Sequence, residues 1–182
     1  MRRFIYVFLL VFLVGCGYKP VSKISDNILA DSVFVDVSMS KTDPQNTVAI
    51  KDAVRSGIVS RLHKRLAPRD IAQTYIIASI QSLSFSVLAY DQYGYATSYR
   101  ANLALNFKTK LKDGSVVNIK GVGDHDFRVT RVAKTKRDTS SVISDKERYD
   151  AIQNASSQAF NEFIATLAIR SFKEQKEVNA TK

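Results

Sequence analysis

Histidine and cysteine are scarce in this chain of 182 residues, which holds two histidines and one cysteine. A single cysteine leaves no intramolecular disulfide, so the fold must be held together by core packing. Two histidines and one cysteine also supply neither a Cys–His nucleophile nor a set of spaced metal ligands. These absences argue against an enzyme and against a metal site, and we expect no cofactor.

A long apolar run is lacking as well. The apolar run at the start of the chain covers residues 4–14, which is eleven residues. At a rise of about 1.5 Å per residue, a helix of that length cannot cross a hydrocarbon core of about 30 Å. We therefore expect no membrane-spanning helix in this run.

The two histidines have polar neighbours that need a separate test. His125 lies between Asp124 and Asp126, but alternate positions of a strand face opposite sides, which separates both carboxylates from the imidazole. His63 stands beside Lys64 on the exposed side of a predicted helix. Neither histidine has the partners of a general base, so a hydrolase is the least supported hypothesis.

The first sixteen residues have the composition of a secretory signal. Arg2 and Arg3 give a basic start, the apolar run follows, and a small residue precedes Cys16, which is the pattern of a cleaved signal peptide. Leu13-Val14-Gly15-Cys16 resembles the lipobox of bacterial lipoproteins, in which the cysteine is acylated and begins the mature chain. The alternative is an ordinary secretory signal with a chance cysteine. Against it, the chain's only cysteine stands where lipidation requires one.

Acylation at Cys16 would attach the protein to a membrane. Several acyl chains on one residue, palmitate among them, anchor stably because each buried CH₂ contributes about 0.8 kcal/mol. The next residue is Gly17, whereas an aspartate there favours retention in the inner membrane. We therefore expect a lipid-anchored protein on the periplasmic face of the outer membrane.

The chain carries a formal net charge of +10 at pH 7, and such an excess favours an anionic partner. Nucleic acid is excluded, because an acylated protein that faces the periplasm does not meet it. Anionic lipid, lipopolysaccharide or an acidic protein surface fits both the charge and the location.

Composition and periodicity divide the chain into four parts. Residues 1–15 are expected to form the signal peptide and residues 16–31 an acylated tether. Residues 32–175 have the length of a single α/β domain, and residues 176–182 are expected to form a flexible tail.

The first half of the domain predicts a strand, a helix and a long strand. Residues 32–39 alternate like a half-buried strand. A stripe with a repeat of four then predicts a helix that ends at Ala67, before Pro68. The stripe consists of Ile50, Val54, Ile58, Leu62 and Leu66. In the β-rich stretch 74–90 the buried phase changes once, which predicts a bulge near Gln81 and Ser82.

The second half of the domain predicts a meander and a long helix. Residues 99–111 alternate cleanly, and Asp113-Gly114 predicts a hairpin to a returning strand over residues 117–129. Gly121 and Gly123 in that strand indicate a bend or close packing. After a polar loop, Ser144-Asp145-Lys146-Glu147 predicts a capping box that opens a helix of about thirty residues.

This order of elements, β-α-β-β-β-α, predicts an α+β fold. We expect a two-layer sandwich in which two helices pack on one face of a four-stranded mixed sheet. Two helices cover only one face of such a sheet. The other face, with its polar and basic positions, would remain open as a binding surface or a solvated one.

The acylatable cysteine is followed by Gly17-Tyr18-Lys19-Pro20, and the domain combines a helical crossover, a meander and a long C-terminal helix. The third predicted strand has the pattern Tyr99-Arg100-Ala101-Asn102-Leu103-Ala104-Leu105-Asn106-Phe107. Together these features resemble the lipopolysaccharide-assembly lipoprotein (LptE) family. The resemblance implies a protein that sits in the lumen of the LptD outer-membrane β-barrel, binds lipopolysaccharide and assists its insertion into the outer leaflet.

The open face and the basic loop after it hold the candidate lipopolysaccharide-binding residues. Phosphates and carboxylates of lipid A and the inner-core sugars suit charge-assisted hydrogen bonds with lysine and arginine. The alternative is a solvated run of charge. The candidates are Arg100, Lys108, Lys110, Lys120, Arg128, Arg131, Lys136 and Arg137.

Four tyrosines surround the turn at residues 91–95, namely Tyr90, Tyr93, Tyr95 and Tyr99. Rigid amphipathic side chains on a loop are typical of protein contacts. We therefore regard these tyrosines as candidate contacts with a partner protein, with local packing as the alternative.

Two functions of different classes remain open. The first is a non-enzymatic lipoprotein that plugs an LptD-like outer-membrane barrel and handles lipopolysaccharide. The second is an outer-membrane lipoprotein adaptor, which regulates a cell-wall synthase or serves a phospholipid-transport system.

We predict that Cys16 carries the acyl chains and is the first residue of the mature protein. Intact-mass measurement and incorporation of labelled palmitate test this directly. Cys16→Ser protein should incorporate no label. Acyl chains on that variant, or a mature wild-type chain that starts at another residue, would contradict the prediction.

Overall fold

The computed structural model describes residues 26–38, 44–129 and 143–180, and the side chains of these as far as residue 170. Cys16, Arg131, Lys136 and Arg137 therefore lie outside the described residues. The elements are β1 (Ser32–Val37), α3 (Pro44–Leu62), β2 (Arg65–Leu66), β3 (Thr74–Tyr90), β4 (Ala96–Lys110), β5 (Val116–Arg128) and α4 (Asp145–Ala180).

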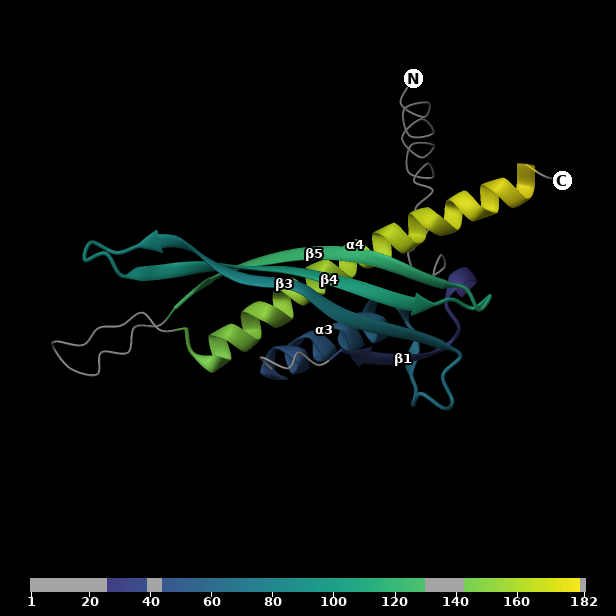
Figure 1. Cartoon of the computed structure of the whole chain (residues 1–182), viewed down its shortest axis with the longest axis horizontal. Coiled ribbons are helices and arrows are strands. Elements are labelled where there is room, and N and C mark those ends of the chain that lie inside the picture. The colour runs from purple at the N-terminus through teal and green to yellow at the C-terminus, as the bar shows by residue number, and fades with distance from the viewer. Residues whose placement is uncertain (1–25, 39–43, 130–142, 181–182) are drawn as a thin grey trace, which may run out of the picture.

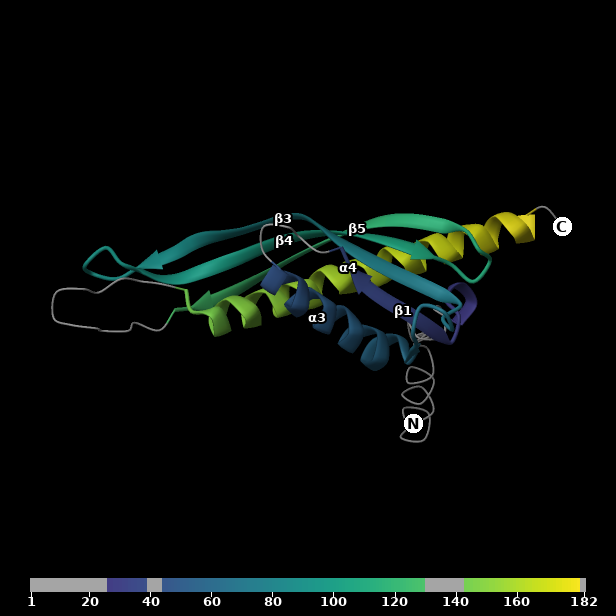
Figure 2. The same ribbon diagram turned by 60° about the horizontal axis from the view of Figure 1, so that its bottom comes forward.

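One mixed sheet with strand order β2-β1-β3-β4-β5 forms the first layer. Strand β1 pairs in parallel with β2 and β3, and the long strands β3, β4 and β5 form an antiparallel meander. Helices α3 and α4 lie on the same side of the sheet (Figures 1 and 2). The predicted α+β sandwich is thus confirmed, although the sheet has five strands where four were predicted.

The additional strand, β2, follows an early end of α3. His63 adopts a left-handed conformation with φ of 53°, and the Lys64 N–H donates to the Ile58 carbonyl at 3.3 Å across the last turn. The chain then runs beside β1, where the Arg65 N–H donates to the Asp31 carbonyl at 3.0 Å. The predicted helix therefore extended too far, because Leu66 pairs in a strand.

A second correction concerns the start of the domain. Ile28, Leu29 and Ala30 are buried in the core, although they fall within the predicted tether. The Lys64 ammonium, almost fully buried, holds this segment through contacts of 2.6 Å to Asp26 and 3.1 Å to Asp31. A buried cation needs paired carboxylates of this kind.

The predicted bulge and hairpin turns of the meander are confirmed. The register of β3 against β4 shifts between Ile80 and Ser82, where the change of phase predicts a bulge. Gly94 and Gly114 occupy the two hairpin turns with φ of 81° and 89°, a conformation that glycine adopts without steric cost. The Asp113 carboxylate accepts hydrogen bonds from the Ser115 N–H and hydroxyl at 2.9 and 2.7 Å.

Helix α4 begins with the predicted capping box. The Ser144 N–H donates to the Glu147 carboxylate at 2.9 Å, and the Glu147 N–H donates to the Ser144 hydroxyl at 3.3 Å. The helix continues through Ala180, into the segment predicted as a flexible tail. Among the residues that the structure describes, no helix combines the length and the apolar composition needed to span a membrane.

The core lies between the sheet and the two helices. Its largest buried side chains include Phe107 of β4 and Phe160 and Phe163 of α4. The rings of Phe107 and Phe163 lie 4.7 Å apart, and those of Phe160 and Phe163 lie 5.5 Å apart. The aromatic cluster thus joins α4 to the middle of the sheet.

Two glycines of β5 allow α4 to approach the strand closely. A Cβ atom on Gly121 would lie 2.2 Å from the Ala159 carbonyl oxygen, and one on Gly123 would lie 2.0 Å from the Ala155 carbonyl oxygen. No side chain fits in these positions unless the helix moves. Of the two predicted roles for these glycines, close packing is therefore the correct one.

The two edges of the sheet differ. At the β5 edge, the N–H groups of Val122 and Asp124 donate to the side chains of Glu162 and Gln158 of α4, at 2.5 and 3.2 Å. At the other edge, β2 pairs only with Ser32 and Val33 of β1. No strand among the described residues pairs with the outer edge of β1 beyond that point.

We predict that Gly123→Ala lowers the free energy of unfolding by about 1–3 kcal/mol, because the added methyl group forces α4 away from β5. Chemical denaturation measures this change. Val122→Thr is the matched control. That side chain is half exposed on the opposite face, so its substitution should change stability by less than about 0.5 kcal/mol. Equal stability of Gly123→Ala and wild type would contradict the close contact.

Candidate functional site

The face of the sheet away from the helices carries the candidate cations of the strands. In the antiparallel register, Lys108 lies opposite Asn118, and Lys120 lies opposite Asn106. Lys110 lies two residues beyond Lys108 on the same face of β4. These three side chains therefore occupy one end of the open face, and we call Lys108, Lys110 and Lys120 the lysine patch.

No carboxylate accompanies the lysine patch at neighbouring positions of the open face. The opposite residues on β3 are Ile77 and Tyr75, and the opposite residues on β5 are Asn118 and Val116. None of the ion pairs among the described residues includes a member of the patch. Within the described part of the chain, no carboxylate pairs with the three cations of the patch.

Arg100 lies between the lysine patch and the β3–β4 turn, opposite Asp126 on β5, and is placed differently. Its guanidinium donates to both oxygens of Asp126, at 2.6 and 2.8 Å, and lies 3.6 Å from Asp124. The hydrogen bond and the charge of Asp126 raise the pKa of Arg100, and the hydrogen bond from Arg100 lowers the pKa of Asp126. The sequence suggests one continuous positive surface, but this pair neutralises its centre.

Of the remaining basic candidates, the structure describes only Arg128, which does not join the lysine patch. Arg128, exposed at the end of β5, lies opposite Ser98, near the other end of the open face. Arg131, Lys136 and Arg137 follow it outside the described residues. The structure therefore brings together three of the eight candidates.

Sequence reasoning missed the pair of Arg100 with Asp126, although a signal for it exists. The hairpin at Asp113-Gly114 places Lys110 opposite Val116. Counting back along both strands from that turn gives Arg100 opposite Asp126, on the face shared by opposed residues. The charge of the partner strand would have removed Arg100 from the predicted positive surface.

The tyrosine candidates separate into two groups. Tyr90, Tyr93 and Tyr95 are exposed at the β3–β4 turn, by 65%, 68% and 36%. Tyr99 instead stacks on Phe127, with ring centroids 6.0 Å apart and an interplanar angle of 23°. We call Tyr90, Tyr93 and Tyr95 the tyrosine tip, and Tyr99 belongs to the local packing beneath it.

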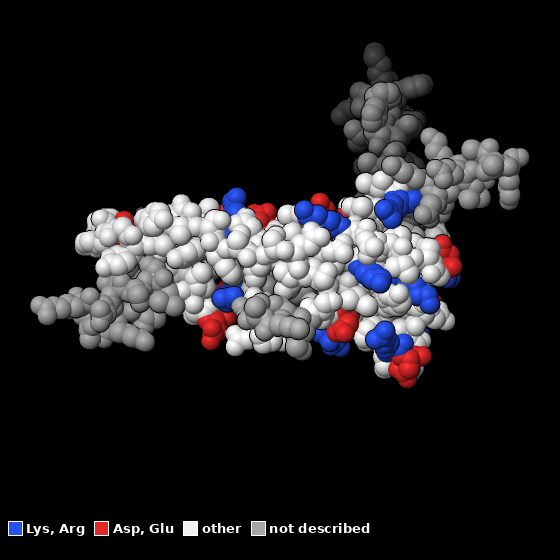
Figure 3. Space-filling view, in the orientation of Figure 1, with Lys and Arg blue, Asp and Glu red and all other residues white. Residues whose placement is uncertain are grey.

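The hairpin that carries the tyrosine tip is almost without charge. Between residues 84 and 99, Asp91 is the only charged residue, and its carboxylate accepts the N–H groups of Tyr93 and Tyr95 at 2.8 and 3.0 Å. Val87 and Leu88 add exposed apolar surface. Figure 3 shows this end of the molecule nearly free of charged side chains, while blue side chains gather toward the opposite end.

The tyrosine tip and the lysine patch lie far apart. The tip is at the β3–β4 turn, which projects past the beginning of α4 (Figure 1). The patch lies where β4 ends and β5 begins, at the other end of the meander. The molecule therefore has two surfaces of different chemistry at its two ends.

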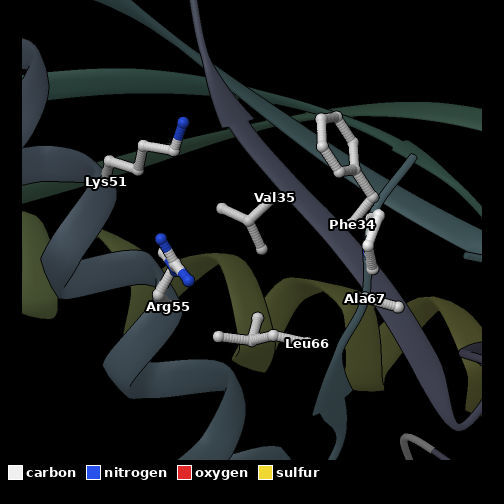
Figure 4. A pocket seen from close by; sticks show the side chains of 7 residues that line it. Phe34, Val35, Lys51, Arg55, Leu66 and Ala67 are labelled. Atoms are coloured by element: carbon white, nitrogen blue, oxygen red, sulfur yellow. The ribbon is translucent and has the colours of Figure 1, made fainter.

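A hollow that sequence analysis did not predict lies between α3 and the outer edge of β1. It measures about 310 Å³ and is lined by Phe34, Val35, Lys51, Arg55, Leu66, Ala67 and Pro68. Lys51 and Arg55 extend from α3 toward the strand (Figure 4). Their spacing of four residues, which puts them on one helix face, is the only trace of this hollow in the sequence.

Comparison with solved structures finds chains that are similar to this one. A putative lipoprotein from Caulobacter crescentus matches with a TM-score of 0.50 at 9% identity, over 86% of this chain and 98% of that one. Rare lipoprotein B from Shewanella oneidensis matches with a TM-score of 0.39 at 16% identity, over 82% and 99%. A minor lipoprotein from Acinetobacter baumannii matches with a TM-score of 0.42 at 7% identity, over 78% and 94%.

The sequence itself identifies a family. No curated protein matches the chain. The family described as LptE, lipopolysaccharide-assembly, matches residues 33–167, from the second residue of β1 to the middle of α4. This match covers more than half of the chain and confirms the resemblance carried by the layout of the elements. The chain therefore belongs to the LptE family of lipopolysaccharide-assembly lipoproteins.

Proposed function

We propose that this protein is a non-enzymatic outer-membrane lipoprotein that binds lipopolysaccharide and acts as the assembly partner of an LptD-type β-barrel. The observation that carries the proposal is the lysine patch, whose three cations lie together on the face that neither α3 nor α4 covers. Membership of a lipopolysaccharide-assembly family supports the same substrate.

The chemistry of the lysine patch suits a ligand with several phosphates. Lysine ammonium groups donate hydrogen bonds to phosphate oxygens. Each is a compact charge on a flexible side chain, so the patch can accommodate phosphates in different geometries. Exposed charge pairs contribute only about 0.2–1 kcal/mol each. Binding should therefore depend on all three lysines together and weaken as salt increases.

The tyrosine tip supplies a surface of the kind that proteins contact. Tyrosine is enriched in the buried centre of protein interfaces and charged residues are depleted there. Both properties hold for this hairpin. In our proposal the tip meets the barrel partner, and the lysine patch at the other end remains available to lipopolysaccharide.

We predict that Lys108→Gln/Lys110→Gln/Lys120→Gln protein binds lipopolysaccharide about tenfold more weakly than wild type, because three small contributions are lost together. Titration of the mature lipoprotein in detergent with labelled lipopolysaccharide measures the affinity. The control Arg100→Gln/Asp126→Asn changes the same face without changing the net charge and should bind like wild type. A triple variant that binds normally at low salt would contradict this assignment.

We also predict that Tyr90→Ser/Tyr93→Ser/Tyr95→Ser protein no longer copurifies with the barrel, while its binding of lipopolysaccharide is unchanged. Mass spectrometry of material copurified with the tagged lipoprotein measures the association. Val59→Ser removes an exposed apolar side chain on α3 and should leave the association intact. If a cell-wall synthase or an inner-membrane transporter copurifies with wild type in place of a barrel, the adaptor function replaces this proposal.

A further inference from the structure

The outer edge of β1 has fewer hydrogen-bond partners among the described residues than the edge of β5. Side chains of α4 accept the edge N–H groups of β5, whereas the short strand β2 covers β1 only as far as Val33. Beyond it, the backbone groups of Val35 and Val37 face outward, since the N–H of Ser38 donates inward to Ala78 at 2.8 Å. An edge with which no described strand pairs is a template for one more strand.

A groove runs along this edge, because α3 stands opposite it. The hollow of about 310 Å³ has an apolar floor of Val35 and Leu66, and Ala67 and Pro68 close one end where the chain leaves β2. Figure 4 shows Lys51 and Arg55 reaching from α3 over this floor. A strand edge on one side and a helix on the other form a groove. Such a groove contacts the side chains of a bound segment and can thereby select for its sequence.

The groove has an unbalanced positive charge. The Lys51 ammonium lies 3.0 Å from Asp36. Burial acts to raise the pKa of Asp36, but the hydrogen bond from Lys51 outweighs it together with other contacts, and the pKa is lowered. Asp36 therefore stays ionised and balances Lys51. Arg55 is exposed and forms no hydrogen bond or ion pair with a described residue, so its charge is available to a ligand.

We propose that the groove between β1 and α3 docks an extended acidic segment of a partner protein, which pairs with the outer edge of β1 and places a carboxylate on Arg55. This inference does not depend on the proposed handling of lipopolysaccharide. Backbone pairing supplies affinity, and the cations and the apolar floor supply selectivity for a segment that alternates acidic and apolar residues.

Charge and backbone chemistry favour this occupant over three others. A lipid cannot pair with a row of backbone donors and acceptors as a strand does. A second copy docked edge to edge would bring Lys51 and Arg55 against the same cations of its mate, which is unfavourable. Residues 17–25 of the chain hold two lysines and no acidic residue, so this segment also repels the groove.

A test uses the synthetic peptide acetyl-Ser-Glu-Val-Glu-Val-Glu-Ser-amide as the acidic probe. A second peptide, in which glutamine replaces every glutamate, is the neutral control. Fluorescence anisotropy measures binding to the mature lipoprotein in detergent, and hydrogen–deuterium exchange locates it. We expect the acidic peptide to bind and to protect amides within residues 34–38. The neutral peptide should bind about tenfold more weakly, since it lacks the charge interaction.

Variants of the protein distinguish peptide binding in the groove from non-specific attraction to the positive charge of the protein. Arg55→Gln should weaken binding of the acidic peptide by about tenfold, and Ala67→Trp should block it by filling the hollow. Lys108→Gln/Lys120→Gln removes two cations from the open face and should leave peptide binding unchanged. Circular dichroism confirms that each variant is folded.

Three results would overturn the inference. The first is the absence of binding at millimolar peptide, or protection outside residues 34–38. The second is protection of residues 34–38 by vesicles of anionic lipid but not by peptide, which would make the groove a lipid site. The third is concentration-dependent protection of wild type alone, which would identify a second copy as the occupant.

Discussion

The contact between the backbone of β5 and the backbone of α4 is the constraint on which the arrangement of surfaces depends. Gly121 and Gly123 leave no room for a side chain beneath Ala155 and Ala159, so the helix lies directly on the strand. At that distance, side chains of α4 reach the β5 edge and accept its N–H groups. The helix thereby covers one face and one edge. Neither α3 nor α4 covers the other face, and no described strand pairs with the outer edge of β1 beyond Val33.

The charges on the open face differ from one end of the face to the other. The bidentate pair of Arg100 with Asp126 neutralises the middle of the face, and the lysine patch occupies one end without a carboxylate beside it. At the opposite end, the tyrosine tip carries apolar and aromatic surface. Both surfaces suit the proposed function, in which lipopolysaccharide is an anionic ligand and the barrel is a protein partner.

Features that depend on a few neighbouring residues could be predicted from the sequence, and features set by distant contacts could not. The phase change near Gln81, the Asp113-Gly114 turn and the capping box at Ser144 are local signals, and each is confirmed. Strand β2 was missed because two residues carry no periodicity, and its pairing depends on β1 far away in the chain. The hollow beside β1 was missed for the same reason, since its walls come from three elements.

Photocrosslinking in cells tests the central claim, that the uncovered face handles lipopolysaccharide, most directly. A photoreactive amino acid at Asn118, which lies opposite Lys108, samples the open face beside the lysine patch. The same amino acid at Val59, exposed on α3, samples the helix layer. We predict crosslinks to lipopolysaccharide from Asn118 and none from Val59. Crosslinks from Val59 with none from Asn118 would contradict the claim.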